Sequence, residues 1–527
     1  MKSILYVWLP CKEIYPIGLT YLSNFIHSRH PEINQQILDL TPIPVERRKQ
    51  VLREVIKQNK SDLVCFSWRD IQVFAPHEGD ASLKYAFNFY HSLNPFKKAY
   101  ASYKGLEFLW RYYQGIREFL GYPWLVAEEF PDTAVMIGGG AFSVFADQLI
   151  HKLPEGTIGI LGEGEEAVLK VVEGKPLDDE RYLIKQRGTV HTGKKGHYLP
   201  LTDFSLDVRY LSKIYPQHTV HRGNYIGVQT KRGCPYDCQF CEYPYIEGKE
   251  VRHRPPAAVL HDIKQHYEFW GTRKFWFTDA QFITGREAYV QVMEILERIK
   301  AERFQIEWSG YVRTSHITAE LAKLMVATGV GDLEVAITSG SQAIINELHM
   351  GFSLEKLYEG CRHLKDAGFK GKVILNYSPN SPGETEQTLL ESVQSYKKIA
   401  AILGEDHVFP MLFFLGVQPH TGFEDRLLTE GYLSQGYNPL SLNPLTIKKL
   451  LYNPPPFSKL IAKACLKAWE AKEKELRQTQ EIARDLTGHY ADTNLFAGVV
   501  KDSGRQVLIN IERELEDPVV PSYSVPR

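Results

Sequence analysis

Short apolar runs alternate with stretches of helical periodicity over the first 190 residues. The predicted strands are Ile4–Leu9, Gln36–Leu40, Asp62–Ser67, Ala134–Ile137 and Thr157–Leu161. Helical spacing between them is clearest at Gly18–Ser28 and Val45–Gln58. Short buried strands that alternate with helices are typical of a parallel sheet covered by helices on both faces. We therefore predict a doubly wound α/β domain over residues 1–190.

An aromatic-rich stretch at about 84–128 interrupts this alternation. Its aromatic residues recur at helical spacing, which predicts inserted helices. We expect these side chains to pack between domains, and the alternative is a cover over an apolar ligand. The basic residues among them either face solvent or contact phosphates or a membrane surface. These residues are Lys97, Lys98, Lys104, Arg111 and Arg117.

Residues 200–430 repeat the alternation of strands and helices. The predicted strands are Tyr225–Thr230, Lys274–Thr278, Gln305–Tyr311, Asp332–Thr338, Lys372–Ser378 and Val408–Leu415. Six strand–helix units predict an incomplete TIM-like (β/α)6 barrel, whose functional groups lie at the C-terminal ends of the strands. The polar stretch 174–222 before it is predicted as a linker. Residues 431–527 are predicted as a mostly helical C-terminal domain, with a charged helical run at Leu460–Thr487.

The composition is that of a globular protein without strong charge bias. The chain is 43% hydrophobic and 24% charged, with a formal net charge of -1. No global field therefore favours nucleic acid or an anionic membrane. No apolar run is long enough for a transmembrane helix, and Met1–Leu9 is not followed by a small-residue cleavage site. We predict a cytoplasmic protein with no nucleic-acid partner and no transmembrane segment.

Seven cysteines are present, and three of them cluster in one short segment. An odd number in a long chain favours a reducing compartment and a metal site over a disulfide framework. Cys234, Cys238 and Cys241 follow a predicted strand at C-x3-C-x2-C spacing. Three thiolates on one loop can hold a [4Fe–4S] cluster and leave one iron open for S-adenosylmethionine (SAM). The alternative is zinc, for which His253, twelve residues on, is the nearest fourth ligand.

The segment Lys231–Cys241 resembles the signature of the radical SAM superfamily, including the aromatic Phe240 before the third cysteine. The resemblance implies that Phe240 lies beside the SAM adenine. The segment Phe275–Phe282 resembles the second-strand segment of that superfamily. There Asp279 is expected to meet the amino acid portion of SAM, and the alternative is a turn or a helix N-cap. Arg313, after the third strand, is expected to pair with the SAM carboxylate or to form a surface ion pair.

The next two strand ends resemble the same superfamily. Leu333–Ser341 resembles the fourth-strand motif G-I-E-S-G-S, but Thr338 stands where a glutamate is usual. A carboxylate contact to SAM is therefore lost or supplied elsewhere, and Ser339 is expected to reach the ribose or the carboxylate. Asn376–Thr385 resembles the fifth-strand segment G-x-P-G-E-T, and Asn376 is assigned to cofactor binding. This segment also suits a simple turn into a helix.

The strand ends of residues 1–190 resemble the Rossmann-like cobalamin-binding domain of one radical SAM class. That class includes methylases and the anaerobic Mg-protoporphyrin monomethyl ester cyclase. Glycines at this edge of a parallel sheet let the backbone approach a flat ligand. The resemblance implies that cobalamin is bound by Pro16, Gly18, Ser67, Gly138, Gly139, Gly162, Glu163 and Gly164. No D-x-H-x-x-G motif is present, so no histidine is evident as a lower axial ligand to the cobalt of cobalamin. Two alternatives stay open: the domain binds cobalamin, or it has kept the fold and lost the cofactor.

The resemblance implies a cobalamin-dependent radical SAM enzyme. The expected reaction is C-methylation of an unactivated carbon through a 5′-deoxyadenosyl radical and methylcobalamin. One alternative is a cyclase, oxidase or rearrangement enzyme without methyl transfer, and another is a non-catalytic iron–sulfur protein. The expected partners are a small-molecule, lipid or tetrapyrrole-type substrate and an external one-electron donor such as a flavodoxin or ferredoxin.

Overall fold

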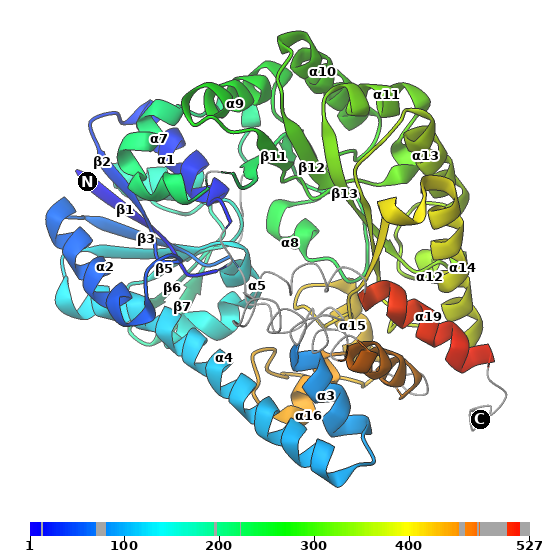
Figure 1. Cartoon of the computed structure of the whole chain (residues 1–527). Coiled ribbons are helices and arrows are strands. Elements are labelled where there is room, and N and C mark those ends of the chain that lie inside the picture. Colours follow the sequence, from blue (N-terminus) through cyan, green and yellow to red (C-terminus); the bar gives the residue numbers. More distant parts are fainter. Residues whose placement is uncertain are drawn as a thin grey trace, which may run out of the picture.

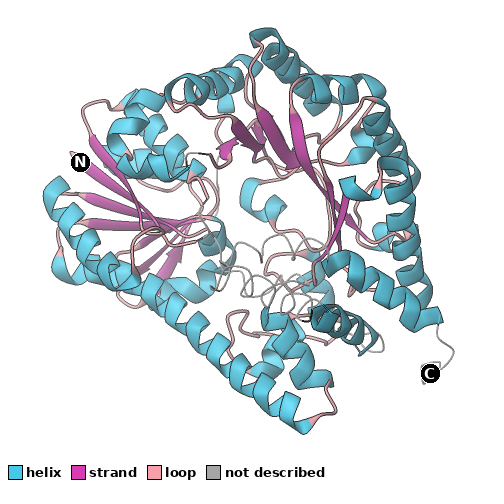
Figure 2. Cartoon of the chain, viewed as in Figure 1, coloured by secondary structure: helices cyan, strands magenta, loops and turns pink. Residues whose placement is uncertain are grey.

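A computed structural model of the chain has two sheets that face each other across the centre of the molecule, with helices on their outer sides (Figure 1, Figure 2). The structure describes residues 1–527 except 12–13, 70–80, 194–197, 222, 453–458, 472–473, 475–502 and 517–527. No helix in the described part of the chain is long and apolar enough to cross a membrane.

The first domain is built on a seven-stranded sheet with the order β2-β1-β3-β4-β5-β6-β7. Its strands are β1 (Ser3–Trp8), β2 (Asn34–Asp39), β3 (Leu63–Ser67), β4 (Ala134–Gly138), β5 (Ile158–Ile160), β6 (Tyr182–Gln186) and β7 (Thr189–Thr192). Its helices are α1 (Ile17–Arg29), α2 (Val45–Asn59), α3 (Ala81–His91), α4 (Pro95–Glu129), α5 (Gly140–Leu149) and α6 (Glu165–Glu173). The strands β1 to β5 are parallel, which confirms the predicted doubly wound domain.

Helices cover both faces of this sheet, so β1 is buried at every position. Ile4 and Tyr6 face a large core that continues into the barrel, whereas Leu5 and Val7 face a second core under α2, α4 and α5. This double burial explains why the strand is a continuous apolar run instead of an alternating one.

The predicted linker at 174–222 is wrong for much of its length. Its residues include the antiparallel hairpin of β6 and β7 and the helix α7 (Val208–Ile214). The hairpin forms because Leu183 packs into the second core and because Arg187 and Gly188 both adopt positive φ, 52° and 74°. Two such residues in succession are typical of the tight turn that matches strand twist.

The inserted helices between β3 and β4 are confirmed as α3 and α4. The helix α4 begins at Asn94, whose side chain accepts hydrogen bonds from the N–H groups of Phe96 and Lys97, and at Pro95 in its first turn. Its last turns bury Tyr122 under the first sheet. The expectation that the aromatic residues pack between domains is wrong for the first two thirds of α4, where most of them are exposed.

The second domain is the predicted incomplete barrel. Its six parallel strands have the order β15-β14-β13-β12-β11-β8. They are β8 (Ile226–Val228), β11 (Lys274–Phe277), β12 (Glu307–Tyr311), β13 (Val330–Thr338), β14 (Val373–Tyr377) and β15 (Val408–Leu412), and a small ribbon adds β9 (Lys231–Arg232) and β10 (Arg252–His253). The barrel helices are α8 (Tyr243–Glu247), α9 (Pro256–Phe269), α10 (Arg286–Glu302), α11 (Ala319–Ala327), α12 (Gln342–Glu347), α13 (Leu354–Asp366) and α14 (Glu386–Leu403).

The described part of the C-terminal region is mostly helical, as predicted. Within residues 431–527 it comprises α16 (Pro444–Leu450), a helix at 459–471 and α19 (Ser503–Glu516), and α15 (Gly422–Thr429) precedes it inside the predicted barrel domain. The predicted run Leu460–Thr487 is helical up to residue 471, and nearly all of the rest lies outside the described residues.

Candidate active site

The three clustered cysteines lie on the loop that follows the first barrel strand and the short β9. Cys234 comes soon after β9, and the Cys241 N–H donates to the Cys238 carbonyl oxygen at 3.1 Å. Gly233, before the first cysteine, has φ +89°, and a Cβ there would lie 1.9 Å from a backbone carbonyl oxygen. Only glycine fits this position, because a side chain would push the cysteine loop out of place.

The chemistry of these three thiols fits an iron–sulfur cluster. None of them is in a disulfide, and burial raises the pKa of each one. The neighbouring cysteine thiols raise the pKa of Cys234 and Cys241 further. Three adjacent, unbonded thiols are the donor set of a cluster, and iron binding would displace their protons. Within the described residues no three Cys, His, Asp or Glu side chains, these three cysteines included, already stand in the geometry of a metal site, so the arrangement does not separate a cluster from zinc.

Arg313 lies against the cysteine loop. Its guanidinium donates to the Cys238 Sγ at 3.4 Å and to the carbonyl oxygen of Met350. The same group lies 3.6 Å from the centre of the Tyr236 ring, and the residue is 7% exposed. Tyr236 is in turn held by a 2.9 Å hydrogen bond with His316. The predicted pairing of Arg313 with the SAM carboxylate stays a prediction, and its guanidinium contacts a predicted cluster ligand, Cys238.

Asp279 ties the end of the second barrel strand to the base of the cysteine loop. Its carboxylate accepts hydrogen bonds from the Thr230 N–H at 2.8 Å and from the Lys231 N–H and Nζ at 3.1 and 3.0 Å. Both members of the Asp279–Lys231 ion pair are fully buried. Burial lowers the pKa of Lys231, and the Asp279 carboxylate opposes that shift. A SAM contact from Asp279 stays a prediction, and the contacts in hand make it a positioning residue.

The end of β13 is strained where the family motif departs from the usual. Thr338 has φ +64°, a conformation that β-branched residues rarely adopt. Ser339 beside it is fully buried, and its hydroxyl contacts the Ser392 hydroxyl at 3.2 Å and accepts from the Ser341 N–H at 3.2 Å. Backbone strain of this kind persists only where the surroundings enforce it, and it collects at ligand sites. The predicted contact from Ser339 to SAM stays a prediction.

Glu384, which the sequence analysis did not assign to cofactor binding, lies next to this strand end. Its carboxylate accepts a hydrogen bond from the Thr388 hydroxyl at 2.5 Å. Burial raises its pKa to about 7, and the hydroxyls of Thr388 and Ser339 oppose that rise. Its second oxygen, Oε1, is buried and has no hydrogen-bond partner among the described residues. Glu384 is therefore in place to supply the carboxylate that is missing at Thr338.

Two further predicted cofactor residues occupy different surroundings. Asn376 faces the barrel interior, and its Oδ1 is buried without a partner in the described part of the chain. Burial raises the pKa of Glu334 on the adjacent strand, and hydrogen bonds with Asn376 and Tyr311 oppose that rise. Phe240 is half-buried between two small apolar clusters, one of them on α12. Contacts of Asn376 and Phe240 with SAM stay predictions.

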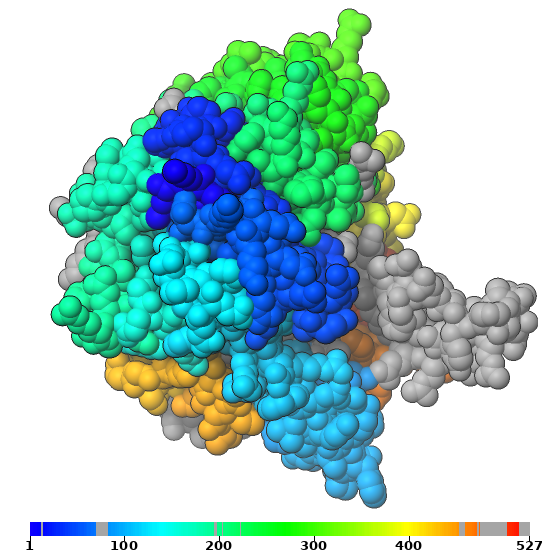
Figure 3. Space-filling view, turned by 90° about the vertical axis from the view of Figure 1, so that its left-hand side faces the viewer, coloured from blue at the N-terminus to red at the C-terminus, as the bar shows by residue number. Residues whose placement is uncertain are grey.

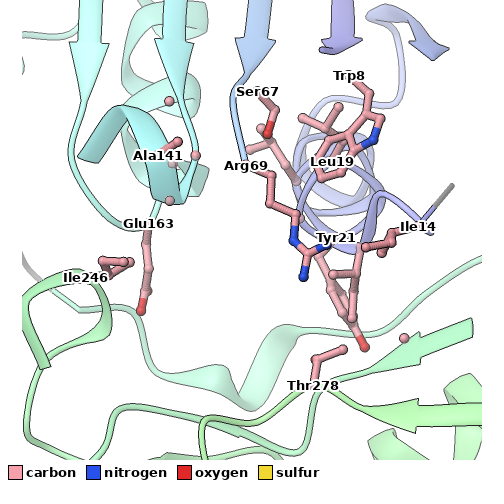
Figure 4. Close-up of a pocket in the computed structure, with 18 of the residues that line it drawn as sticks. Trp8, Ile14, Leu19, Tyr21, Ser67, Arg69, Ala141, Glu163, Ile246 and Thr278 are labelled. Atoms are coloured by element: carbon pink, nitrogen blue, oxygen red, sulfur yellow. The ribbon is translucent and has the colours of Figure 1, made fainter. Parts of the chain in front are cut away.

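A cavity of about 970 Å³ lies between the two domains (Figure 4). On its barrel side the Trp276 ring stands edge-on between the rings of Tyr225, at 6.1 Å, and Tyr311, at 5.4 Å. Arg232 and Glu242, which flank the cysteine loop on either side, also line it. The cavity therefore reaches the loop on which the cluster ligands lie.

The sheet edge of the first domain forms the other wall. The predicted cobalamin residues in this wall are Gly18, Ser67, Gly138, Gly139, Gly162, Glu163 and Gly164. Pro16 lies between the lining residues Tyr15 and Ile17 without lining the cavity itself. Gly139 has φ +98°, and a Cβ there would lie 2.4 Å from the Trp68 carbonyl oxygen. A Cβ on Gly18 would meet no atom within 4 Å, so this wall has room for a flat ligand.

Buried charges join the two domains beside the cysteine loop. The Arg232 guanidinium lies 2.7 Å from the Glu165 carboxylate and 3.2 Å from that of Glu163. Arg252 also pairs with Glu163. Burial raises the pKa of Glu165, but Arg232 outweighs it, so the net shift is downward. Burial also raises the pKa of Glu247, which accepts from the Gly233 N–H at 3.1 Å, to about 7.

Sequence reasoning missed the side chains whose partners come from the other domain. Arg232 and Arg252 pair with acidic residues more than sixty positions earlier, and no local spacing marks them. Arg69 also projects into the cavity (Figure 4). Its place two residues after β3, at the ligand edge of a parallel sheet, is the one signal that was available.

The barrel matches a known family model. The model of the radical SAM superfamily matches residues 228–395. Among curated proteins, the chain is 25% identical over 214 residues to the hopanoid C-2 methylase of Rhodopseudomonas palustris, which covers 39% of this chain and 38% of that protein. The chain spans 36–55% of the length of the first curated relatives that it matches.

Two solved structures have the same overall architecture. One is the radical SAM methyltransferase TsrM from Kitasatospora setae, solved with tryptophan and a SAM analogue, with a TM-score of 0.65, 18% identity and 89% of each chain covered. The other is the cobalamin-dependent radical SAM enzyme OxsB with aqua-cobalamin bound, with a TM-score of 0.65, 12% identity, and 97% of this chain and 72% of that chain covered. At such identities the likeness concerns the fold. Residues 228–395 of this chain are thus a radical SAM domain, and the chain as a whole has the fold of the cobalamin-dependent radical SAM enzymes.

Proposed function

We propose that this protein is a cobalamin-dependent radical SAM methylase that transfers a methyl group to an unactivated carbon of a small-molecule, lipid or tetrapyrrole-type substrate. One observation carries the proposal: a single cavity is lined both by the glycine-rich sheet edge of the first domain and by the residues that flank the cysteine loop. Two cofactors placed at these two walls would share one reaction space.

The bound groups would supply the radical chemistry. The cluster would supply the electron, SAM would supply the 5′-deoxyadenosyl radical, and cobalamin would supply the methyl group. The residues of the chain hold and orient these groups. Cys234, Cys238 and Cys241 supply the three thiolates, and Arg313 places a positive charge on Cys238. Asp279 anchors the base of the loop through its buried bonds to Lys231 and Thr230.

The aromatic wall of the barrel would limit the access of water to the reacting groups. Tyr225, Trp276 and Tyr311 line it with aromatic rings, and the Tyr225 hydroxyl donates to Glu307. Limiting water in this way reduces side reactions of a reactive intermediate. The names of the relatives support the methyl-transfer reading, since the hopanoid C-2 methylase acts by methylation. An external one-electron donor such as a flavodoxin or ferredoxin would complete the reaction.

The first test concerns the cluster. In anaerobically reconstituted protein, Cys238→Ala should lose most iron and acid-labile sulfide and all SAM cleavage. Cys361→Ala is the matched control, because Cys361 is a buried cysteine on α13 outside the loop. If Cys238→Ala keeps its iron content and its SAM cleavage, the proposal fails.

The second test separates methylation from the other radical reactions. With an authentic substrate, a methylase should form both S-adenosylhomocysteine and 5′-deoxyadenosine, and the product should gain the mass of one methyl group. Formation of 5′-deoxyadenosine alone, with no gain of mass, would instead establish a cyclase, oxidase or rearrangement enzyme.

The third test concerns cobalamin. Gly18→Leu should fill the open wall of the cavity and abolish retention of hydroxocobalamin on gel filtration, while the iron content stays unchanged. Gly115→Leu is the control, because a Cβ on Gly115 of α4 also meets no atom within 4 Å and lies outside the cavity lining. Equal retention of hydroxocobalamin by both variants would remove the first domain from the proposed site.

A further inference from the structure

Exposed apolar side chains concentrate on the helical insertion of the first domain. Of the fifteen large apolar side chains that are exposed among the described residues, nine lie between residues 93 and 124. They are Leu93, Phe96, Tyr100, Tyr103, Leu106, Phe108, Trp110, Tyr113 and Trp124. Scattered apolar residues on a surface are ordinary, but a contiguous patch marks a site of interaction with a protein or a membrane.

These side chains form straight rows along α4. Phe96, Tyr103 and Trp110 are spaced by seven residues, which is close to two helical turns, and they are 84%, 63% and 59% exposed. Leu106 and Tyr113 continue the same face at three-residue steps. We call this set, residues 96, 100, 103, 106, 110 and 113, the aromatic stripe. A stripe of this length on one side of a helix is a flat contact surface.

Basic residues run beside the aromatic stripe. Lys97, Lys104 and Arg111 follow its first row by one position each and repeat the same seven-residue spacing. Residues 94–117 contain five basic residues and one acidic residue, Glu107, a formal net charge of +4. Glu107 pairs with both Lys104 and Arg111, and Lys97 pairs with Glu470. The five basic residues outnumber these two acidic partners, so the local formal charge is still positive.

The rest of the molecule holds this helix outward. The last turns of α4 are anchored under the first sheet, where Tyr122, Leu125 and Val126 are buried. The first turns extend away from both domains, next to α3 and α16 (Figure 1). In the space-filling view the same segment forms a projection at the edge of the molecule (Figure 3). A projecting helix can lie on a flat surface without a clash from the domains behind it.

The residue types identify the partner. Lysine is depleted at protein–protein interfaces, whereas two lysines, Lys97 and Lys104, stand beside this stripe. Tyrosine and tryptophan are enriched at the boundary between lipid and water, and neighbouring Lys and Arg side chains reach the phosphates. We propose that the aromatic stripe and its basic neighbours dock this protein onto the surface of an anionic phospholipid bilayer, with α4 parallel to the membrane plane.

The test is co-sedimentation of the full-length protein with vesicles. The protein should pellet with vesicles that contain phosphatidylglycerol in phosphatidylcholine and should not pellet with phosphatidylcholine alone. Each basic residue near a membrane surface contributes roughly fivefold in affinity. The charge reversals Lys104→Glu and Arg111→Glu together should therefore weaken binding at least about twenty-fold, and raised salt should weaken wild-type binding.

A second variant tests the aromatic contribution. Tyr103→Ser with Trp110→Ser should abolish pelleting, while the circular dichroism spectrum and the iron content stay at the wild-type level. The control is Val290→Ser, because Val290 is an equally exposed apolar residue on the distant helix α10 (Figure 1). Its binding should equal that of the wild type.

Three results would overturn the proposal. The first is no pelleting of the wild type with anionic vesicles, and the second is pelleting of the Tyr103→Ser, Trp110→Ser variant at the wild-type level. The third is a wild-type dimer, measured by light scattering, that this variant dissociates, which would make a second copy of the chain the occupant. Vesicle binding requires neither cluster nor substrate, so each of these results leaves the proposed methylase activity standing.

Discussion

Replacing Arg232 by methionine tests whether buried charge holds the two domains together. The Arg232 side chain is 8% exposed and contacts the carboxylates of Glu165 and Glu163, which are 5% and 12% exposed. Methionine keeps the unbranched apolar stem and removes the charge. Because Glu163 keeps its bond to Arg252, the carboxylate left without a cation is that of Glu165.

The expected cost follows from this burial. Removing one partner of a buried ion pair costs about 3–5 kcal/mol, because the other charge stays desolvated. We expect the lower end, about 3 kcal/mol, because Glu165 opens α6 and keeps favourable backbone N–H groups beside it. In a domain of this size that loss lowers the unfolding midpoint by about 6–12 °C.

The assay is thermal unfolding of the cofactor-free protein, followed by circular dichroism. Adding Glu165→Gln to Arg232→Met should recover part of the loss, since it neutralises the orphaned carboxylate. Arg426→Met is the control, because Arg426 pairs with Glu347 and Glu430 on the surface and such pairs contribute less than about 1 kcal/mol. A midpoint for Arg232→Met that matches the control, or a further fall on adding Glu165→Gln, would refute the reasoning.

Three further predictions concern single residues. Arg313→Leu should make the reconstituted cluster harder to reduce, because it removes the hydrogen bond from Arg313 to Cys238. If reduction of the cluster strengthens that bond by about 1–2 kcal/mol, the reduction potential should fall by roughly 50–100 mV. Potentiometry followed by electron paramagnetic resonance measures the potential, and an unchanged midpoint potential would contradict the prediction. Burial lowers the pKa of His266 to about 3, so the folded state binds its proton less readily than the unfolded state and loses stability as the pH falls below about 6.5. His266→Phe should therefore lose about 2 kcal/mol less than the wild type between pH 7 and pH 5, measured by urea unfolding, and parallel pH profiles would count against it. Gly340→Ala should destabilise the barrel by about 1–3 kcal/mol, because a Cβ there would lie 2.4 Å from the Ser392 Cα. Gly115→Ala should leave stability unchanged or raise it, because a Cβ there would meet no atom within 4 Å. Equal unfolding midpoints for the two variants would contradict this prediction.

Much of the architecture follows from patterns that are local in the sequence. The run at Ile4–Leu9 predicts a strand, because both faces of its sheet are covered and apolar residues are continuous there. The run at Lys274–Thr278 also predicts a strand, although its burial alternates, because one face of its sheet lines the cavity. The hairpin at 182–192 escaped, since its polar residues conceal a single buried position, Leu183. A short edge hairpin needs little apolar surface, so its pattern resembles that of a loop.

The exposure of the aromatic stripe on α4 shows the opposite case. Helical spacing of aromatic residues predicts a helix correctly, but it predicts burial as readily as exposure. Whether Tyr103 and Trp110 meet a neighbouring element depends on where the first sheet holds the far end of α4. That placement is a property of the packed domain.

The sequence alone determined the candidate cluster ligands and most of the order of strands and helices, because thiolate spacing and hydrophobic period are encoded within a few consecutive residues. Only the tertiary structure decided which distant partners the buried charges around the cysteine loop meet. Arg313 contacts Cys238 across 75 positions within the barrel, and Arg232 contacts Glu165 of the first domain across 67. Such contacts arise when strand ends that are far apart in the sequence come to one place, and no local pattern specifies which distant partner a buried charge will find.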